Sequence, residues 1–545
     1  MKEIKKCLES SYIDEMLKKL IPEILFIDER IRLYKELGFC NYNIEQLEEW
    51  VNTRGLFYRE HFYEYLDLKG LTVEDMALAF KKLTEEEKNK LLEKAKQLDC
   101  INLITELIIN YLEEFESIDV DLLRKDFGVS LDLLMLPFIY YLSKKLRDIR
   151  ENIINFQIDS RAIESIVRQL SEYLIQISIK AIICELHDYK EKGLLKGETG
   201  EERFQFFIED RFKEPKKLID FYLKYPVLLR RLAKKTKDFT EFIEKMLTDI
   251  DKSFVKICAK IDIKNDVSYR ITNIECGKGD VHERCRFTAI IEIEGEKKLV
   301  YKPRCLKVKE KFEEFIGWIN GNANAVVPDF LNLIVNKGVY EEDFTIEEFV
   351  TYDSCETEEE VKRYYIRLGE IGALIYLLGG NDIHYENVIA HREYPVVVDL
   401  ESLFQGDTAV FTGESDAYII AFNKIIKSIA RTGVLPFAFG GNNLDLSAVG
   451  GDKQKVPYKV LKLVEAGTDN MHLEYDEAEL GPAQNIPLLN GEKVDYKDYG
   501  NDIIYGIKMI FDFVTKKKEE FLSKLEIFRG EKVRKIIRST QYLSI

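Results

Sequence analysis

The sequence predicts an α+β protein in which a long helical region precedes a strand-rich segment and a second helical segment. Through most of residues 1–255, apolar residues recur at helical spacing between charged residues, which is typical of amphipathic helices. Short segments rich in β-branched residues begin near residue 262, and helical patterns return after residue 351. Strands first and helices afterwards favour a two-lobed α+β unit behind the helical region.

Three segments are predicted along the chain. Its 545 residues allow several domains at roughly 100–200 residues each. Residues 1–255 are expected to form a mostly helical region, residues 256–350 a small lobe and residues 351–545 a larger lobe. Most helical faces are structural, so the first region is expected to brace the others, with peptide binding as the alternative.

The composition argues against several classes of protein. A net charge of −17 disfavours nucleic-acid binding, which usually needs a basic surplus. The nine cysteines include no C-x-x-C pair and no cluster with histidine, which indicates a reducing compartment and no zinc site. The charged N-terminus lacks the apolar core of a signal peptide, and no apolar stretch is long enough to span a bilayer. We therefore expect a cytoplasmic protein without a transmembrane segment.

Periodicity predicts individual helices in the first region. The clearest pattern runs from Leu228 to Ile250, where apolar residues recur at helical spacing, and Pro226 stands near its start. Similar patterns cover residues 83–96, 102–116 and 160–185.

The strand-rich segment contains a predicted hairpin. Phe287–Glu294 (FTAIIEIE) is rich in β-branched residues, Glu294–Glu296 reads as a turn, and Lys298–Lys302 (KLVYK) as the returning strand. A helix is then expected over Lys309–Ile319 and a further short strand within Tyr340–Val350.

A helix with clear ends follows. Thr357 and Glu360 form a capping-box pattern at its start, and Gly379-Gly380 ends it. The motif NDIHYEN and the strand pattern YPVVVDLE come directly afterwards. The remaining expectations are a long loop region with one helix over 405–456 and a helical tail over 499–525.

The loop and strand after this helix carry residues suited to phosphoryl transfer. Asp382 and Asn387 have the five-residue spacing that protein kinases use, with His384 between them, and Asp399 and Glu401 stand at the end of the next strand. In such a site one carboxylate orients the substrate hydroxyl, while an amide oxygen and a second carboxylate hold Mg²⁺ on the nucleotide phosphates. The alternative is a polar loop that caps its own turns.

Lys302, on the returning strand of the hairpin, is the candidate cation for nucleotide phosphates. The alternative is an ordinary surface lysine. A glutamate partner is expected from the following helix, where three residues compete: Glu310, Glu313 and Glu314.

Two glycine-containing motifs complete the candidates. In Gly277–His282 the glycines allow close approach of backbone amides to phosphate, and Asp280 beside His282 could form an acid–base pair. The alternative there is a turn with a solvated histidine. Gly467–Met471 reads by spacing alone as a turn.

Taken in order, these motifs resemble class II lanthipeptide synthetases, the LanM family. The matching strings are GDVHERCRFTAIIEIEGEKKLVYKPR at 279–304, GGNDIHYENVIAHREYPVVVDLESLF at 379–404, GTDNMHLE at 467–474, VRKIIRSTQYL at 533–543 and YPVLLRRL at 225–232. The resemblance is strong from about residue 220 to residue 543. It implies a lipid-kinase-like catalytic unit, made of the two lobes named above and wrapped by helices.

The resemblance also implies an activity. ATP and Mg²⁺ would serve to phosphorylate Ser or Thr of a ribosomally made precursor peptide with leader and core, and the same site would then eliminate phosphate to leave dehydroalanine or dehydrobutyrine. The residues implied for phosphorylation are Lys302 at the nucleotide phosphates, Asp382 as catalytic aspartate with His384 in its loop, and Asn387 and Asp399 as Mg²⁺ ligands. Those implied for elimination are Asp280, His282, Lys462 and Thr468.

The chain departs from the family pattern in three respects. Where the family has an arginine before the GTD motif this chain offers Lys462, a point charge rather than a bidentate fork. The zinc-dependent cyclase domain of the family has no counterpart here, and the chain stops at Ile545, where the family's dehydratase domain should continue. We therefore expect either a stand-alone version or a fragment, served by a separate cyclase and an export transporter. Two alternatives stay open: a peptide kinase with impaired elimination, and an inactive scaffold that binds the leader peptide.

Overall fold

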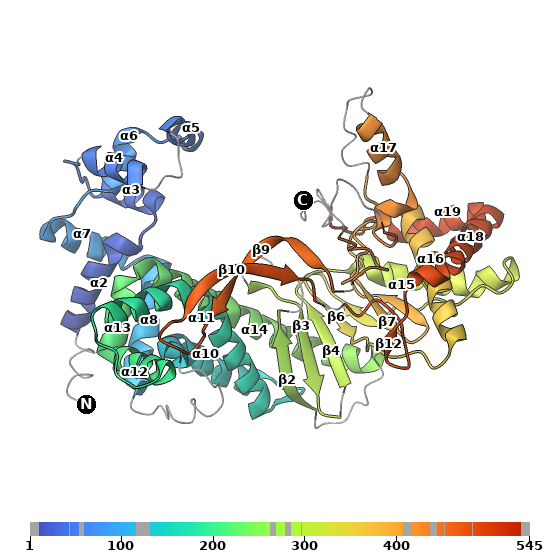
Figure 1. The fold of residues 1–545 in the computed structure, drawn as a ribbon, viewed down its shortest axis with the longest axis horizontal. Coiled ribbons are helices and arrows are strands. Elements are labelled where there is room, and N and C mark those ends of the chain that lie inside the picture. The colour runs from blue at the N-terminus through green and yellow to red at the C-terminus, as the bar shows by residue number, and fades with distance from the viewer. Residues whose placement is uncertain are drawn as a thin grey trace.

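A computed structural model describes residues 10–42, 44–53, 59–115, 131–261, 269–277, 285–295, 297–406, 417–436, 444–451, 453–481 and 483–535. Figure 1 shows an elongated molecule with the N-terminal helices at one end, the largest sheet in the middle and the C-terminal helices at the other end. None of the described helices combines the length and apolarity needed to cross a membrane.

The N-terminal region is helical, as predicted. Its helices are α2 (Ser10–Ile24), α3 (Ile27–Glu36), α4 (Ile44–Thr53), α5 (Arg59–Lys69), α6 (Val73–Ala79), α7 (Glu85–Ala95), α8 (Asp99–Glu114), α10 (Asp132–Asn152), α11 (Ser160–Glu191), α12 (Gly200–Phe212), α13 (Pro215–Lys224) and α14 (Pro226–Lys260). The four helices predicted from periodicity are confirmed in α7, α8, α11 and α14, and Pro226 occupies the first turn of α14. Helix α14 runs through the expected boundary at residues 255 and 256.

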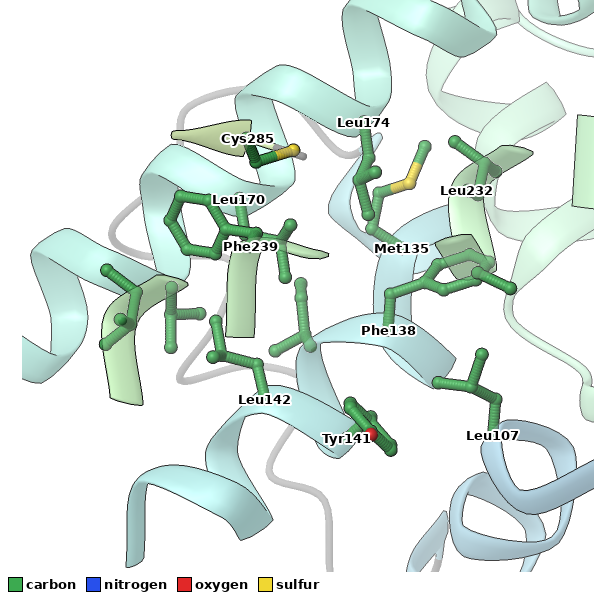
Figure 2. Close-up of a cluster of buried hydrophobic side chains, with 14 of the residues drawn as sticks. Leu107, Met135, Phe138, Tyr141, Leu142, Leu170, Leu174, Leu232, Phe239 and Cys285 are labelled. Carbon is green, nitrogen blue, oxygen red and sulfur yellow. The ribbon is translucent and has the colours of Figure 1, made fainter. Parts of the chain in front are cut away.

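One hydrophobic core joins these helices to the sheet. Figure 2 shows Leu107 of α8, Phe138 of α10, Leu170 of α11 and Phe239 of α14 gathered in a single cluster, with Cys285 at its edge. The same core takes in sheet residues that point to the helical side: Ile274, Ile291, Leu299 and Tyr301. The helices therefore pack against one face of the sheet.

The central sheet has the strand order β1-β2-β3-β4-β6-β5. Its strands are β1 (Gln157–Ile158), β2 (Arg270–Cys276), β3 (Ala289–Ile293), β4 (Lys297–Lys302), β5 (Gly338–Tyr340) and β6 (Thr345–Glu348). The predicted hairpin is confirmed in β3 and β4, where Ile291 faces Leu299. Helix α15 (Lys307–Asn322) follows β4, as expected, and leads through η3 (Ala323–Ala325) toward β5.

The C-terminal lobe is built on helices α16 (Glu358–Leu377) and α18 (Gly500–Lys516). They pack unusually closely, because a Cβ at Gly506 would lie 1.9 Å from the carbonyl oxygen of Ile366. Thr357 caps α16 by accepting from the backbone N–H of Glu360, as predicted. The other elements are β7 (Val388–His391), β8 (Tyr394–Val397), α17 (Ala417–Ile426), η4 (Ile429–Thr432), β9 (Lys455–Val464), β10 (His472–Glu479), β11 (Leu488–Leu489), β12 (Glu492–Lys493), η5 (Tyr496–Tyr499), α19 (Lys518–Lys524) and η6 (Leu525–Phe528).

Strands β9 and β10 form a two-stranded antiparallel ribbon that the sequence did not predict. In Figure 1 this ribbon extends from the C-terminal lobe over to the N-terminal helices. It is therefore a direct link between the two ends of the molecule.

Candidate active site

The loop that follows α16 holds itself in a defined shape. Gly379 ends the helix with a φ of 62°, and Asp382 adopts the same left-handed region with a φ of 65°. The side-chain amide of Asn387 donates to the carbonyl oxygen of Asp382 at 2.8 Å, and its backbone N–H donates to that of His384 at 2.9 Å. Asp382, His384 and Asn387 thus belong to one closed turn. The alternative from sequence, a loop that caps its own turns, is therefore present in this loop.

The segment after β8 lies directly against this loop. Val398 donates its backbone N–H to the carbonyl oxygen of Asn387 at 2.9 Å, and Gln405 donates to that of Gly379, also at 2.9 Å. Between these two contacts, Asn381 donates to the carbonyl oxygen of Ser402 at 3.2 Å. Backbone pairing therefore brings Asp399 beside the loop, as the sequence pattern required.

Lys302 enters the same place from the end of strand β4. Its side chain is buried at 5% exposure, so it is not an ordinary surface lysine. The ammonium lies 3.0 Å from Glu347 Oε2 and 3.8 Å from Asp399 Oδ1, and it donates to the carbonyl oxygen of Val398. Lys302 thus joins strand β4 to the segment that carries Asp399.

The expected glutamate partner from α15 is wrong. Glu313 pairs with Lys260, Glu314 pairs with Lys524, and Glu310 is exposed. The partner is Glu347 on β6, because β6 is the neighbour of β4 in the sheet. Glu347 stands opposite Val300, on the same face as Lys302 and diagonal to it.

Helix α15 supplies a second lysine instead of a carboxylate. Lys309 is fully buried, and its ammonium lies 2.7 Å from Glu347 Oε1 and 3.1 Å from the carbonyl oxygen of Val398. Burial lowers the pKa of Lys309 to about 8. Burial also opposes ionisation of Glu347, but Lys302 and Lys309 outweigh it and hold the pKa of that carboxyl below its usual value.

Two arginines extend the charge cluster. Arg304 lies 2.8 Å from Asp399 Oδ2 and 3.2 Å from Glu401, and Arg534 pairs with the other oxygen of Glu401. The hydrogen bond to Glu401 raises the pKa of Arg534, and the negative charges of Asp382 and Asp399 act in the same direction. Arg534 therefore belongs to the charge cluster through its ion pair with Glu401.

A cleft of about 610 Å³ opens beside these arginines. Its charged lining consists of Arg286, Arg304, Glu401, Lys532 and Arg534. Four cations against one carboxylate make this cleft a fitting place for an anion. Arg534 was not among the residues selected from sequence, although it lies in the string VRKIIRSTQYL. A single basic residue outside any catalytic motif cannot be told from a surface residue by sequence alone.

The oxygen atoms at the centre of the cluster fit a Mg²⁺ ion. Asp399 Oδ1 is buried and accepts no hydrogen bond from the described residues. Burial opposes ionisation of Asp399, but Lys302 and Arg304 hold the pKa of this carboxyl below its usual value. Asn387 uses its amide nitrogen on Asp382, so its side-chain oxygen is the remaining group for a cation. A charged carboxylate and an amide oxygen are suitable ligands for Mg²⁺.

The comparisons with known proteins cover this cluster. The model of a family described as a domain of unknown function, DUF4135, matches residues 225–544. The chain belongs to the DUF4135 family. It is also 26% identical over 381 residues to the Lacticin 481/lactococcin biosynthesis protein LcnDR2 of Lactococcus lactis subsp. lactis, a match that takes in 66% of this chain and 39% of the relative. The chain thus spans about two fifths of the length of this relative.

The DUF4135 region also contains the residues expected for elimination, of which the structure describes Lys462 and Thr468. Asp280 and His282 lie outside the described residues. Lys462, on β9, is half-exposed and pairs with Asp476 of β10 at 2.8 Å. Thr468 sits in the turn between β9 and β10, where its hydroxyl donates to the carbonyl oxygen of Glu465 at 3.0 Å. Among the described residues, neither Lys462 nor Thr468 contacts the cluster around Lys302.

The turn at Thr468 anchors the DUF4135 region on the N-terminal helices. Asp469 is buried at 2% exposure and binds both Nε and Nη2 of Arg203 in α12, at 2.9 and 3.1 Å. Lys190 of α11 lies 3.2 Å from the same carboxylate, and Met471 enters the helical core. The partners of this turn could not be predicted from the spacing of residues, because Arg203 and Lys190 lie more than 250 positions away in the chain.

Proposed function

We propose that this protein is an ATP- and Mg²⁺-dependent peptide Ser/Thr dehydratase of lanthipeptide maturation, which phosphorylates a precursor peptide and then eliminates phosphate. The observation that carries the proposal is the convergence of Lys302, Asp382, Asn387 and Asp399 from two lobes on one cluster. The name of the relative, a lacticin 481 and lactococcin biosynthesis protein, supports a substrate of the same kind.

The architecture around the cluster supports the phosphorylation step. A sheet that is antiparallel from β2 to β5, a following region that carries the loop with Asp382, and a helix after the strand that bears Lys302 support a lipid-kinase-like unit. Bound MgATP would supply the transferable phosphoryl group. Lys302 would bind the phosphates, Asn387 and Asp399 would hold the metal, and Asp382 would orient the peptide hydroxyl and accept its proton.

The cationic cleft supports the elimination step. In that step a base removes the α-proton of the phosphorylated residue, a carbon–carbon double bond forms, and the Cβ–O bond breaks as phosphate leaves with the electron pair. Cations aimed at the leaving phosphate stabilise its departure. Arg304 and Arg534 flank the cleft, and an arginine fork suits phosphate better than a lysine does.

Lys462 leads to a second candidate function. If elimination required Lys462 as its cation, the pairing of Lys462 with Asp476, away from the cluster, would favour a peptide kinase with impaired elimination. We prefer the dehydratase, because Arg534, which pairs with Glu401, already supplies a cation to the cleft beside the cluster. Asp280, His282 and Thr468 stay proposals for the elimination step.

The proposal includes partners and a location. The substrate is a ribosomally made precursor peptide with a leader and a core. A separate cyclase and an export transporter would act on the product. We place the reaction in the cytoplasm, where ATP is available and where thiols such as the free cysteines of the described chain stay reduced.

Nucleotide binding tests the proposal without knowledge of the precursor. Titration calorimetry with ATP and Mg²⁺ is expected to show saturable binding by the wild-type chain and loss of binding by Asp399→Asn. The matched control is Asp476→Asn, which removes an exposed carboxylate of the β9–β10 ribbon and should bind like the wild type. A wild-type chain that does not bind nucleotide, or an Asp399→Asn variant that binds equally well, would contradict the assignment.

A further inference from the structure

Two lysines in the cluster share the same two acceptors. Lys302 of β4 and Lys309 of α15 each contact one carboxylate oxygen of Glu347, at 3.0 and 2.7 Å. Both ammonium groups also donate to the carbonyl oxygen of Val398, the residue before Asp399. One glutamate therefore faces two cations.

The charges around Lys302 show what the second lysine changes. In the ion pair used by protein kinases, one glutamate faces the phosphate-binding lysine and belongs to the helix after its strand. Here that helix presents Lys309, and the glutamate comes from β6. With Lys309 present, Glu347 is shared between two lysines, and Asp399 is paired by Arg304 at 2.8 Å, so Lys302 keeps a net positive charge. Without Lys309, Glu347 would neutralise Lys302 alone.

We propose that Lys309 is a positioning residue for nucleotide binding, which neutralises Glu347 so that Lys302 stays available to the phosphates. This inference rests on the proposed function, because it assigns a polyanionic ligand to Lys302. Lys309 itself is fully buried and does not touch that ligand. It acts through Glu347 and through the carbonyl oxygen of Val398.

Stability alone does not explain a lysine at this position. Burying an ammonium costs several kcal/mol of desolvation, and an apolar side chain of similar volume is often at least as stable. A purely structural pair would also need only one lysine for one glutamate. A second lysine is needed, however, if Lys302 is to keep its positive charge uncompensated beside the buried carboxylate of Glu347.

The test is a double-mutant comparison of MgATP binding, measured by titration calorimetry on the full chain. Lys309→Met is expected to weaken binding by about tenfold or more, because charges a few ångströms apart interact strongly even at an effective dielectric constant of about 20. Adding Glu347→Gln should restore affinity to within about threefold of the wild type, since Lys302 then no longer faces a carboxylate. A structural role for Lys309 predicts instead that the substitutions change thermal unfolding while the folded variants bind MgATP like the wild type.

Controls separate this inference from folding and from the proposed function. Thermal unfolding is recorded for every variant, and Lys309→Gln, which keeps a polar group near both acceptors without the charge, is a second variant expected to bind as weakly as Lys309→Met. Unchanged affinity in the folded Lys309 variants, or no recovery in the double variant, overturns the inference while leaving nucleotide binding by the wild type intact. No binding by the wild type overturns the proposed function and this inference with it.

Discussion

The ammonium of Lys302 lies 3.8 Å from Asp399 Oδ1, which joins the last residue of strand β4 to the segment after β8. The same lysine donates to the carbonyl oxygen of Val398. The contact between strand β4 and the segment after β8 is therefore made by charged groups that nucleotide phosphates and Mg²⁺ would also use under the proposed function.

Asp382 and Asp399 are expected to be indispensable for every modification. Replacing either by alanine should reduce phosphorylation of the precursor by roughly 100-fold or more, since a positioned acid or base contributes that much to a rate. The measurement is phosphate incorporation into the peptide. The control is Asp476→Ala, on the exposed ribbon. Modified peptide formed at the normal rate by Asp382→Ala would contradict the role given to this loop.

Arg534 and Lys462 offer a direct contrast for elimination. Arg534→Ala should leave phosphorylation in place and let phosphopeptide accumulate, because Arg534 pairs with Glu401 and lines the cationic cleft. Lys462→Ala should eliminate phosphate normally, because Lys462 pairs with Asp476 away from the cluster. The ratio of phosphorylated to dehydrated peptide in a mass spectrum reports both. The reverse result would restore Lys462 as the cation for elimination.

Asp469 is expected to hold the β9–β10 ribbon on the helical region. Asp469→Ala removes the buried carboxylate that pairs with Arg203 and Lys190, and it should lower the free energy of unfolding by about 1–3 kcal/mol. Denaturant unfolding measures the change, with Asp476→Ala as the control on the same ribbon. Hydrogen bonding to Arg203 lowers the pKa of Asp469, so this stabilisation should be present at neutral pH and be lost as the pH falls below its usual value of 3.8. Equal stability of the two variants would contradict the anchor.

Glu370 predicts the opposite pH dependence. Burial raises the pKa of this carboxyl in α16 from 4.5 to about 8. Because the folded state binds the proton more tightly, its contribution to stability is full below pH 4.5 and is lost as the pH rises to about 8. Glu370→Gln should therefore match the wild type at acidic pH and exceed its stability above pH 8. Thermal unfolding as a function of pH provides the measurement, and parallel curves for the two proteins would rule the effect out.

The sequence predicted the local parts of the site well. The hairpin that carries Lys302, the capped helix α16 and the loop with Asp382 and Asn387 were all predicted from short-range patterns. Each of these features depends on neighbours in the chain, through alternation of apolar residues, a capping side chain or terminal glycines. The position of Asp399 beside this loop could also be predicted, because the strand that precedes Asp399 comes directly after the loop.

The partners supplied by distant elements could not be predicted in this way. Glu347 reaches Lys302 only because β6 lies beside β4, and that strand order cannot be read from the spacing of residues. Lys309 is fully buried, but in the sequence nothing distinguishes it from the other charged residues of α15. The ribbon of β9 and β10 was missed because it contains Pro457 and alternates weakly. The position of Thr468 near α12, far from Lys302, follows from that ribbon.

The most direct test of the central claim is an intact-mass spectrum of a precursor peptide after incubation with the wild-type protein, ATP and Mg²⁺, and with the Asp382→Ala variant alongside. A dehydratase predicts loss of water at Ser or Thr residues with the wild type and an unchanged peptide with the variant. Phosphate gain without water loss would leave a kinase and contradict the elimination step. A peptide that stays unmodified by a wild-type protein shown to bind MgATP and the precursor would contradict the enzymatic account and favour a leader-binding scaffold.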